Sequence, residues 1–326
     1  MRALRRAAGL VVIAAIAVWL GWALAVAGLV APLTVQPAGP VRAVRFAPGA
    51  AVPHVRHVFV IVMENRSATA ILSGRGDPYL RALARRYVTA TAFYATTHPS
   101  LPNYLALLAG HTFGIRSDAA SPDLHARTLV DSLAAAGVSF GAYMEGLPQA
   151  GSLTGSFLPG LYAGKHDPFR YFVAIRRRRA WRRRIQPLAA LWQPLARGTP
   201  PAFTWITPNL CHDMHTCPTL AGDAWLRIVV PRILASPAWR QGGVLFIVWD
   251  EGNGLSPGAP GHGGRVALFV VAPGLRAGAH ITAPNDDYGL LRTVEDALGV
   301  RCVGRSCTTP PLDLRSVAAF GTGHGA

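Results

Sequence analysis

The chain has 326 residues, of which 51% are hydrophobic and 15% are charged, and its formal net charge is +16. This composition excludes a wholly disordered protein, and the length allows one large α/β domain or two of ordinary size. The positive charge favours anionic partners, but no recognisable nucleic-acid-binding module accompanies it, so we expect no specific nucleic acid as a partner.

The first 33 residues resemble a membrane anchor. Three arginines within residues 1–6 precede an apolar stretch at residues 7–33 that contains no charged side chain. The stretch is longer than the core of a cleavable signal peptide and matches the roughly 20 residues that span a bilayer. We therefore expect a single transmembrane helix at 1–33, with its arginines in the cytoplasm and the rest of the chain outside. A secreted protein with a cleaved signal peptide is the alternative.

Residues 34–53 are rich in Pro, Ala, Gly and Val and are expected to be a linker, so that the folded domain occupies 54–326. Short apolar runs typical of buried strands lie at 57–63, 138–144, 202–207, 243–249 and 266–272. Helical patterns lie at 78–87, 101–108, 128–136, 223–235 and 288–298. This alternation predicts an α/β fold with a mostly parallel sheet covered by helices on both faces.

Residues 152–199 interrupt the alternation with glycines, prolines and arginines, and we expect an insertion or a lid there. Its arginine run begins with Arg176 and ends with Arg184, and it contains Trp181. The run is either a solvated helix face or a surface that holds the protein against anionic lipid or a cell-envelope polyanion.

Four cysteines form two close pairs, Cys211 with Cys217 and Cys302 with Cys307. Outside the cytoplasm such pairs close small disulfide loops, so we expect two local disulfides, with free thiols as the alternative.

Acidic residues follow two of the expected strands. Glu64 and Asn65 come after the run at 57–63, and Asp250 and Glu251 come after the run at 243–249. Carboxylate and amide oxygens at strand ends are suitable ligands for a divalent cation, which would also relieve the repulsion between neighbouring carboxylates. After the first strand, the alternative is a carboxylate that pairs with an arginine or caps the next helix. After the second strand, the alternative is a solvated turn.

Ser100 lies at the entry of the expected helix at 101–108, where unpaired backbone N–H groups and the helix dipole favour a phosphate. It is either placed for chemistry or an ordinary N-cap. A third group, with His212, Asp213 and His215, follows the run at 202–207. It is either part of the same site or a solvated loop, and it lacks the histidine pair of a zinc peptidase helix.

Six motifs of the chain resemble, in their order and spacing, those of the phosphoesterase family. They are ENRS, HPSLPNYLALLAG, PNLCHDMH, WDEG, VAPGLRAG and YGLLRTVEDALG. That family contains bacterial acid phosphatases and phospholipases C and lies within the alkaline phosphatase superfamily. The resemblance covers about residues 57–300, and it implies an alkaline-phosphatase-like three-layer α/β/α sandwich. The segment PSLPN is also similar to the nucleophile segment of nucleotide pyrophosphatases.

The resemblance assigns roles to individual residues. It implies that Ser100 is the nucleophile and also a metal ligand, and that Asn103 binds phosphate. It places further residues near the site, and of these we assign His98 to the substrate and both His215 and His262 to protonation of the leaving group. The implied metal ligands besides Ser100 are Glu64, Asn65, Asp250 and Glu251. We also assign Asp213, which the resemblance places near the site without a fixed role, to the metal.

A serine hydroxyl needs activation, and a divalent cation, with Zn, Mg, Ca and Mn as candidates, would lower its pKa. The expected reaction is hydrolysis of a phosphomonoester through a phosphoserine, as in acid phosphatases. Phospholipase C activity is an alternative, although the segment after Glu251 lacks the histidine-bearing signature of many phospholipase members. A membrane-anchored, non-catalytic protein that binds a polyanion is the alternative from another class.

Overall fold

The computed structural model describes residues 43, 45–73, 77–252 and 262–319. The transmembrane helix expected at 1–33 and half of the linker expected at 34–53 lie outside these residues. None of the helices within the described ranges is long and apolar enough to cross a bilayer. The unit described below is the compact one that spans Pro40–Ala326.

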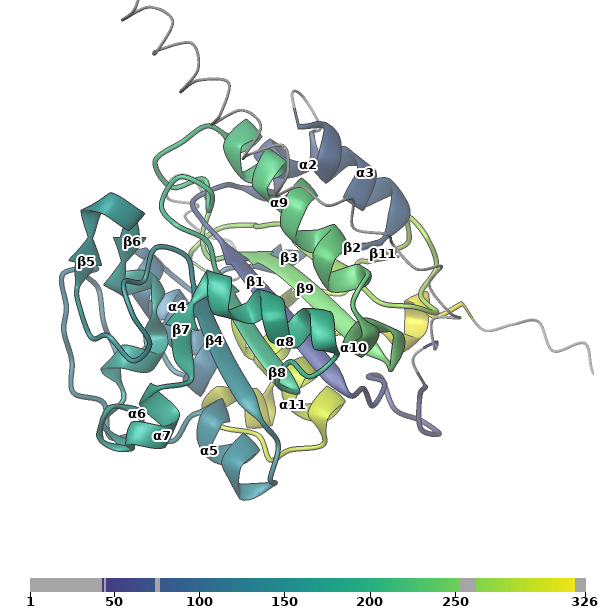
Figure 1. Cartoon of the computed structure of the whole chain (residues 1–326). Helices are drawn as coiled ribbons and strands as arrows, with labels where there is room; N and C mark the ends of the chain where they lie inside the picture. The colour runs from purple at the N-terminus through teal and green to yellow at the C-terminus, as the bar shows by residue number, and fades with distance from the viewer. Residues whose placement is uncertain (1–42, 44, 74–76, 253–261, 320–326) are drawn as a thin grey trace, which may run out of the picture. The chain divides into compact units, whose positions relative to one another are not determined.

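A mostly parallel sheet forms the centre of this unit (Figure 1). Its order is β11 (His280–Ile281), β2 (Val88–Ala90), β10 (Leu268–Val271), β9 (Gly243–Trp249), β1 (His57–Met63), β8 (Phe203–Thr207), β4 (Phe140–Met144) and β7 (Ile185–Pro187). Strand β10 runs antiparallel to both of its neighbours, and the remaining pairs are parallel. The expected α/β fold with a mostly parallel sheet is thus confirmed.

The three central strands are almost entirely buried, which explains their uninterrupted apolar sequences. In the view of Figure 1, α8 (Trp192–Arg197), α9 (Thr219–Leu234) and α10 (Pro237–Arg240) lie in front of the sheet. Behind it lie α4 (Ser100–Ala109), α5 (Leu129–Ala135) and α11 (Asp287–Leu298), whose apolar side chains meet those of β1 and β8. Helices therefore cover both faces of the sheet.

Shorter elements complete the unit. Helices α2 (Ala68–Leu72) and α3 (Pro78–Arg86) follow β1, and β3 (Phe93–Tyr94) pairs with β12 (Asn285–Asp286). Two 3-10 turns, η5 (Gly304–Thr308) and η6 (Arg315–Val317), lie near the C-terminal end. Both expected disulfides, Cys211–Cys217 and Cys302–Cys307, are formed.

The segment 152–199, expected to be an insertion or a lid, supplies one strand of the main sheet and the helix α8. It begins with a hairpin of β5 (Ser156–Phe157) and β6 (Tyr162–Ala163), which are connected by the 3-10 turn η1 (Leu158–Gly160). The turns η2 (Gly164–His166) and η3 (Pro168–Tyr171) and the helices α6 (Val173–Arg177) and α7 (Arg179–Arg182) follow. Strand β7 then adds to the edge of the main sheet beside β4, and η4 (Leu188–Leu191) leads into α8.

Candidate active site

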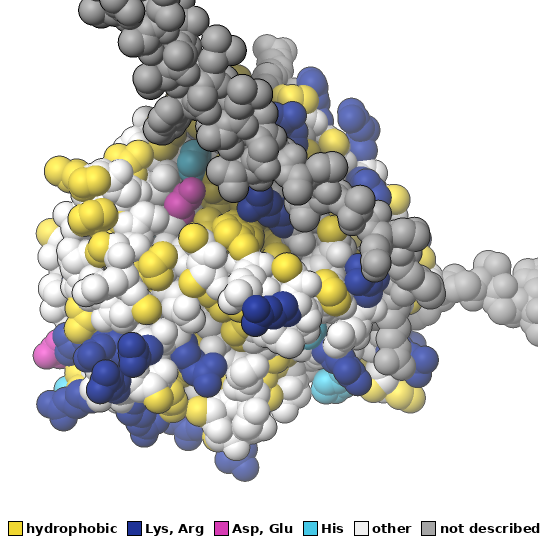
Figure 2. Space-filling model, viewed as in Figure 1, with side chains coloured by type: hydrophobic (Ala, Val, Ile, Leu, Met, Phe, Trp, Pro, Cys, Tyr) yellow, Lys and Arg dark blue, Asp and Glu magenta, His cyan; other side chains and the backbone are white. Residues whose placement is uncertain are grey.

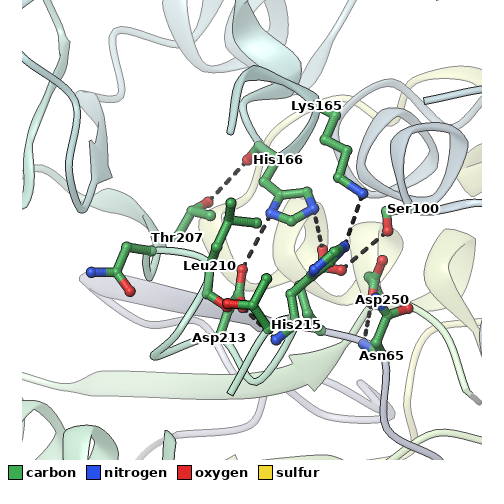
Figure 3. A network of polar contacts seen from close by, with 12 residues as sticks. Asn65, Ser100, Lys165, His166, Thr207, Leu210, Asp213, His215 and Asp250 are labelled. Atoms are coloured by element: carbon green, nitrogen blue, oxygen red, sulfur yellow. Dashed lines mark hydrogen bonds and ion pairs between the residues drawn. The ribbon is translucent and has the colours of Figure 1, made fainter. Parts of the chain in front are cut away.

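The carboxyl ends of β8, β1 and β9 meet at one edge of the sheet, because these strands are parallel neighbours. Glu64 follows β1 and Asp250 follows β9, and the backbone N–H of Asp250 donates to the carbonyl oxygen of Met63 at 2.9 Å. The loop after β8 lies against the end of β1, since the N–H of Glu64 donates to the carbonyl oxygen of Asp213 at 2.8 Å. Glu64, Asp213 and Asp250 therefore lie at one site, and Figure 3 shows the last two of them there.

Ser100 points into this group from the first residue of α4. Its Oγ donates to Oε2 of Glu64 at 3.1 Å and lies 3.4 Å from Oε1 of Glu251. The serine is 1% exposed. Pro99 takes the N-cap position of α4, so the interpretation of Ser100 as a simple N-cap is wrong. The hydroxyl is instead directed at carboxylates.

Asn65 adopts a left-handed backbone conformation with φ of 51°, which asparagine tolerates better than most residues. Its backbone N–H donates to Oδ1 of Asp250 at 3.1 Å. The turn at Asn65 thus ties the end of β1 to the end of β9 and fixes one oxygen of Asp250. The other oxygen, Oδ2, is buried without a hydrogen-bond partner among the described residues.

His166, which the sequence analysis did not single out, lies between two of the carboxylates. Its Nε2 is 3.0 Å from Oε1 of Glu64, and its Nδ1 is 3.2 Å from Oδ2 of Asp213. The ring stacks on Tyr104 of α4, with 5.2 Å between ring centroids and an interplanar angle of 6°. This buried imidazole comes from the short turn η2, within the segment expected to be an insertion.

Lys165, the neighbour of His166, was also missed. Its Nζ lies 2.6 Å from Oδ2 of Asp118 and 3.1 Å from Nε2 of His215. Asp118 in turn accepts the N–H of Leu101, in the first turn of α4, at 3.0 Å. Lys165 therefore brings a positive charge to the end of α4 that carries Ser100. A signal was present in the sequence, because Lys165 is the chain's single lysine among 32 lysines and arginines.

The remaining predicted residues lie around this centre. Nδ1 of His98 is 2.6 Å from Oε2 of Glu251. Asn103 is fully buried, and its amide accepts the N–H of Thr97 and donates to the carbonyl oxygens of Thr97 and Pro99. In the structure, Asn103 thus holds the loop before Ser100. His262 is exposed, and the backbone N–H of its neighbour Gly263 donates to the carbonyl oxygen of Ala95.

Burial and crowding shift the pKa values of the acidic groups upwards. Burial, with the nearby carboxyl of Asp213, raises the pKa of Glu64 well above its usual range. Burial also raises the pKa of Asp213 to about 8. The pKa of Asp250 is raised by burial and by the carboxyls of Glu64 and Glu251. Without a cation, these three carboxyl groups therefore tend to stay protonated. A bound cation would allow them to ionise.

The pKa values of the two imidazoles move in the opposite direction. Burial and the charge of Lys165 lower the pKa of His166 well below its usual range. The same causes, with the neighbouring His166, lower the pKa of His215 to about 4. Both rings are therefore neutral near pH 7, which is the form that binds a metal ion.

The donor set suits a divalent cation. Glu64, His166 and His215 each offer one ligand atom, and these atoms all lie within 4.8 Å of one another. Mixed carboxylate and imidazole donors are typical of zinc, manganese and related ions. On the other side of Glu64, the carboxyls of Asp250 and Glu251 lie close to Ser100, as the sequence predicted. Two neighbouring groups of side chains that could hold a cation thus share Glu64.

Comparisons with known proteins agree with this geometry. The model of the phosphoesterase family matches residues 71–301. The phosphatidylinositol-3-phosphatase of Mycobacterium tuberculosis is 32% identical over 294 residues, which cover 89% of this chain and 92% of the relative. The phosphate-repressible acid phosphatase of Penicillium chrysogenum is 27% identical, but this chain spans only 56% of its length.

The fold also matches a solved structure from the alkaline phosphatase superfamily. That structure, from Vibrio parahaemolyticus, superposes with a TM-score of 0.55 over 86% of this chain and 75% of the other, at 14% identity. Because the sequence identity is low, this match bears on the fold alone. Together with the family match, it places the fold in that superfamily. The chain belongs to the phosphoesterase family and is a hydrolase of phosphoric esters.

Proposed function

We propose that the protein hydrolyses phosphomonoesters through a phosphoserine at Ser100. The observation that carries the proposal is the buried Ser100 hydroxyl, which starts α4 and lies within 3.1 to 3.4 Å of oxygens of Glu64 and Glu251. A hydroxyl directed at carboxylates, with the N-terminus of a helix behind it, suits attack on a phosphoryl group whose oxygens face the helix.

A divalent cation held by this site would lower the pKa of the serine hydroxyl and offset the charge of the phosphoryl oxygens. We propose Glu64, Asn65, Ser100, Asp250 and Glu251 as one set of ligands, and Glu64, Asp213, His166 and His215 as the source of another. The orphaned Oδ2 of Asp250 and the neutral imidazoles support this assignment. The donors are compatible with Zn, Mn, Mg or Ca.

The chain's own residues perform the other steps. Lys165 binds the phosphoryl oxygens beside the start of α4, where Asp118 holds both its ammonium and the N–H of Leu101. Asn103 holds the loop that orients Ser100. His98 is fixed by Glu251 at the edge of the site and contacts the substrate.

His215 is better suited to bind a cation than to act as the predicted proton donor, because its pKa of about 4 leaves it neutral near pH 7. We therefore assign protonation of the leaving group to the exposed His262.

A phosphomonoester is favoured over a phosphodiester as the substrate. The two relatives compared above carry the names of phosphatases, and one is named for a phosphoinositide. Phospholipase C activity, the alternative from the sequence, has no comparable support. A non-catalytic polyanion-binding protein is disfavoured, since a group of buried carboxyls around a serine is costly without a cation.

The cellular setting remains a proposal. We propose that residues 1–33 anchor the protein in the cell membrane with the catalytic unit outside, the alternative being a secreted form. The arginine run at 176–184 would then face anionic lipid or a cell-envelope polyanion. In the structure, Arg178 lies over the ring of Trp181, 4.1 Å from its centroid, which keeps the run compact.

The proposal is tested by release of p-nitrophenol from p-nitrophenyl phosphate by the purified full chain. We expect metal-dependent turnover that a chelator abolishes and that one or more of the four ions restores. Bis-p-nitrophenyl phosphate serves as the diester control, and we expect slower turnover on it. Equal turnover with and without chelator, or faster turnover on the diester, would contradict the proposal.

A further inference from the structure

Large exposed hydrophobic side chains gather in one short part of the chain. Among the described residues, six large hydrophobic side chains are exposed, and four of these lie between residues 153 and 161. Leu158 is 77% exposed, and Leu153, Phe157 and Leu161 are each 38% exposed. Figure 2 shows hydrophobic side chains along the edge where Figure 1 places β5 and β6. We call residues 153–161 the apolar hairpin tip.

The backbone holds this tip in a defined position. Gly146 and Gly160 approach so closely that a Cβ atom on Gly146 would lie 2.0 Å from the carbonyl oxygen of Gly160. The guanidinium of Arg170 donates to the carbonyl oxygen of Leu153 at 2.7 Å. The N–H of Gly164 donates to the carbonyl oxygen of Gly155 at 2.6 Å. The tip is therefore fixed to the fold while its side chains face solvent, which is costly unless something covers them.

The tip stands directly beside the active site. Strand β6 and Gly164 connect the tip to Lys165 and His166, which are the fourth and fifth residues after Leu161. On its other side, the carbonyl oxygen of Leu161 accepts the N–H of Leu210, in the loop that carries Asp213 and His215. Figure 3 shows Leu210 next to these residues. A surface that covers the tip would therefore lie close to the groups that receive the phosphate.

Positive charge accompanies the apolar tip. The N–H of Gly151, which precedes the tip, donates to the carbonyl oxygen of Ile185 at 2.8 Å, and a Cβ on Gly151 would meet the backbone of Arg182 at 3.3 Å. The arginine run is thus tied to the base of the hairpin. Figure 2 shows Lys and Arg side chains gathered where Figure 1 places α6 and α7, on the same side of the molecule as β5 and β6. An apolar tip beside a basic cluster matches an anionic bilayer, with acyl chains below charged head groups.

We propose that the apolar hairpin tip inserts into the surface of an anionic phospholipid bilayer and presents the active site to phosphomonoesters carried by lipids. Leu158 and Phe157 enter the acyl boundary, and the arginine run contacts the head groups. The statement about the substrate rests on the proposed function, whereas the docking itself does not. The tip is not part of the catalytic machinery, so its removal leaves a soluble substrate unaffected.

Docking is tested with an environment-sensitive fluorophore. Leu158→Cys in the full chain, with both disulfides intact, is labelled with NBD and reconstituted in vesicles of equal parts phosphatidylcholine and phosphatidylglycerol. We expect a blue-shifted emission that doxyl lipids quench. Ile228→Cys is the matched control, because Ile228 is 55% exposed on α9, and its label should stay in water. Vesicles of phosphatidylcholine alone should give a weaker shift. Equal water exposure of the labels at 158 and 228 would overturn the proposal.

The consequence for turnover is tested with the double variant Phe157→Ser and Leu158→Ser. We expect turnover of a phosphatidylinositol phosphate in the same vesicles to fall about tenfold or more, because two apolar side chains that enter the bilayer are lost. Turnover of p-nitrophenyl phosphate should be unchanged, which also shows that the variant folds. A parallel loss on both substrates, or none on the vesicles, would overturn the proposal. If the wild type lacks phosphatase activity, the proposed function fails while the fluorescence result still decides docking.

Discussion

Two regions of different construction meet at the candidate active site. The acidic strand ends, Glu64, Asp250 and Glu251, follow two of the three central strands of the sheet and are almost completely buried. The basic turn, Lys165 and His166, belongs to the short 3-10 turn η2, next to an exposed hairpin. Rigid strands thus fix the carboxyl groups, while a peripheral turn supplies the positive charge and an imidazole. The difference implies that chemistry depends most on the strand ends and that recognition of the phosphate depends on the turn.

The largest expected effect comes from the hydroxyl directed at the acidic strand ends. Ser100→Ala should lower kcat on p-nitrophenyl phosphate by about a thousandfold or more, since the nucleophile is removed. Ser132→Ala, at a buried serine of α5, is the matched control and should retain activity. Steady-state kinetics measures kcat, and circular dichroism shows whether both variants are folded. Near wild-type turnover of the Ser100 variant would exclude this serine as the nucleophile.

The imidazole of the basic turn should come second. His166→Ala removes the contacts to Glu64 and Asp213, and we expect metal affinity or turnover to fall about 10- to 100-fold. His57→Ala, at the opposite end of β1, serves as the control. Metal content by mass spectrometry and turnover across a metal titration measure the effect. Unchanged metal affinity would mean that the ion sits on the strand ends alone.

The lysine of the basic turn should affect recognition more than chemistry. Lys165→Met removes a charged donor, and we expect kcat/KM to fall about 10- to 100-fold, mainly through KM. Lys165→Arg tests the shape of the cation, because a planar guanidinium does not replace a compact ammonium between Asp118 and His215. We expect partial recovery at most. A change in kcat alone would contradict a role in recognising the phosphate.

A smaller effect concerns the loop before Ser100, which Asp287 holds by accepting the N–H and the hydroxyl of Thr96. Burial raises the pKa of Asp287 from 3.8 to about 8. The folded state therefore binds more protons than the unfolded state between these values, so stability falls as the pH rises through this window. Asp287→Asn should flatten this dependence by up to about 1.4 kcal/mol per pH unit in the free energy of unfolding. Denaturant titrations at several pH values measure it, and an unchanged slope would contradict this assignment.

The two regions also differ in how far the sequence alone could reveal them. The strands at 57–63 and 243–249 are long apolar runs followed by acids, and parallel neighbours bring their ends together. The basic turn could not be found in this way. The helices, turns and strands from β5 to α7 around it are two to five residues long and show no hydrophobic periodicity. Only the tertiary fold therefore brings Lys165 and His166 to Glu64.

Small strands were also missed in the sequence. The short strands β2, β7 and β11 extend the sheet without a distinct apolar run. Their pairing depends on neighbours that are far away in the chain, as β7 with β4 shows. By contrast, the ends of the five expected helices differ from the structure by at most a few residues, because their apolar periodicity is local, as in α11.

The central claim is that Glu64, Ser100 and the pair Asp250–Glu251 surround one shared cation. A crystal structure of the full chain grown with manganese, with anomalous data collected at its absorption edge, tests it most directly. The account predicts an anomalous peak within about 2.0–2.6 Å of Oγ of Ser100 and of carboxylate oxygens of Glu64 and Asp250. A peak bound away from Ser100, or none in crystals of an active enzyme, would contradict it.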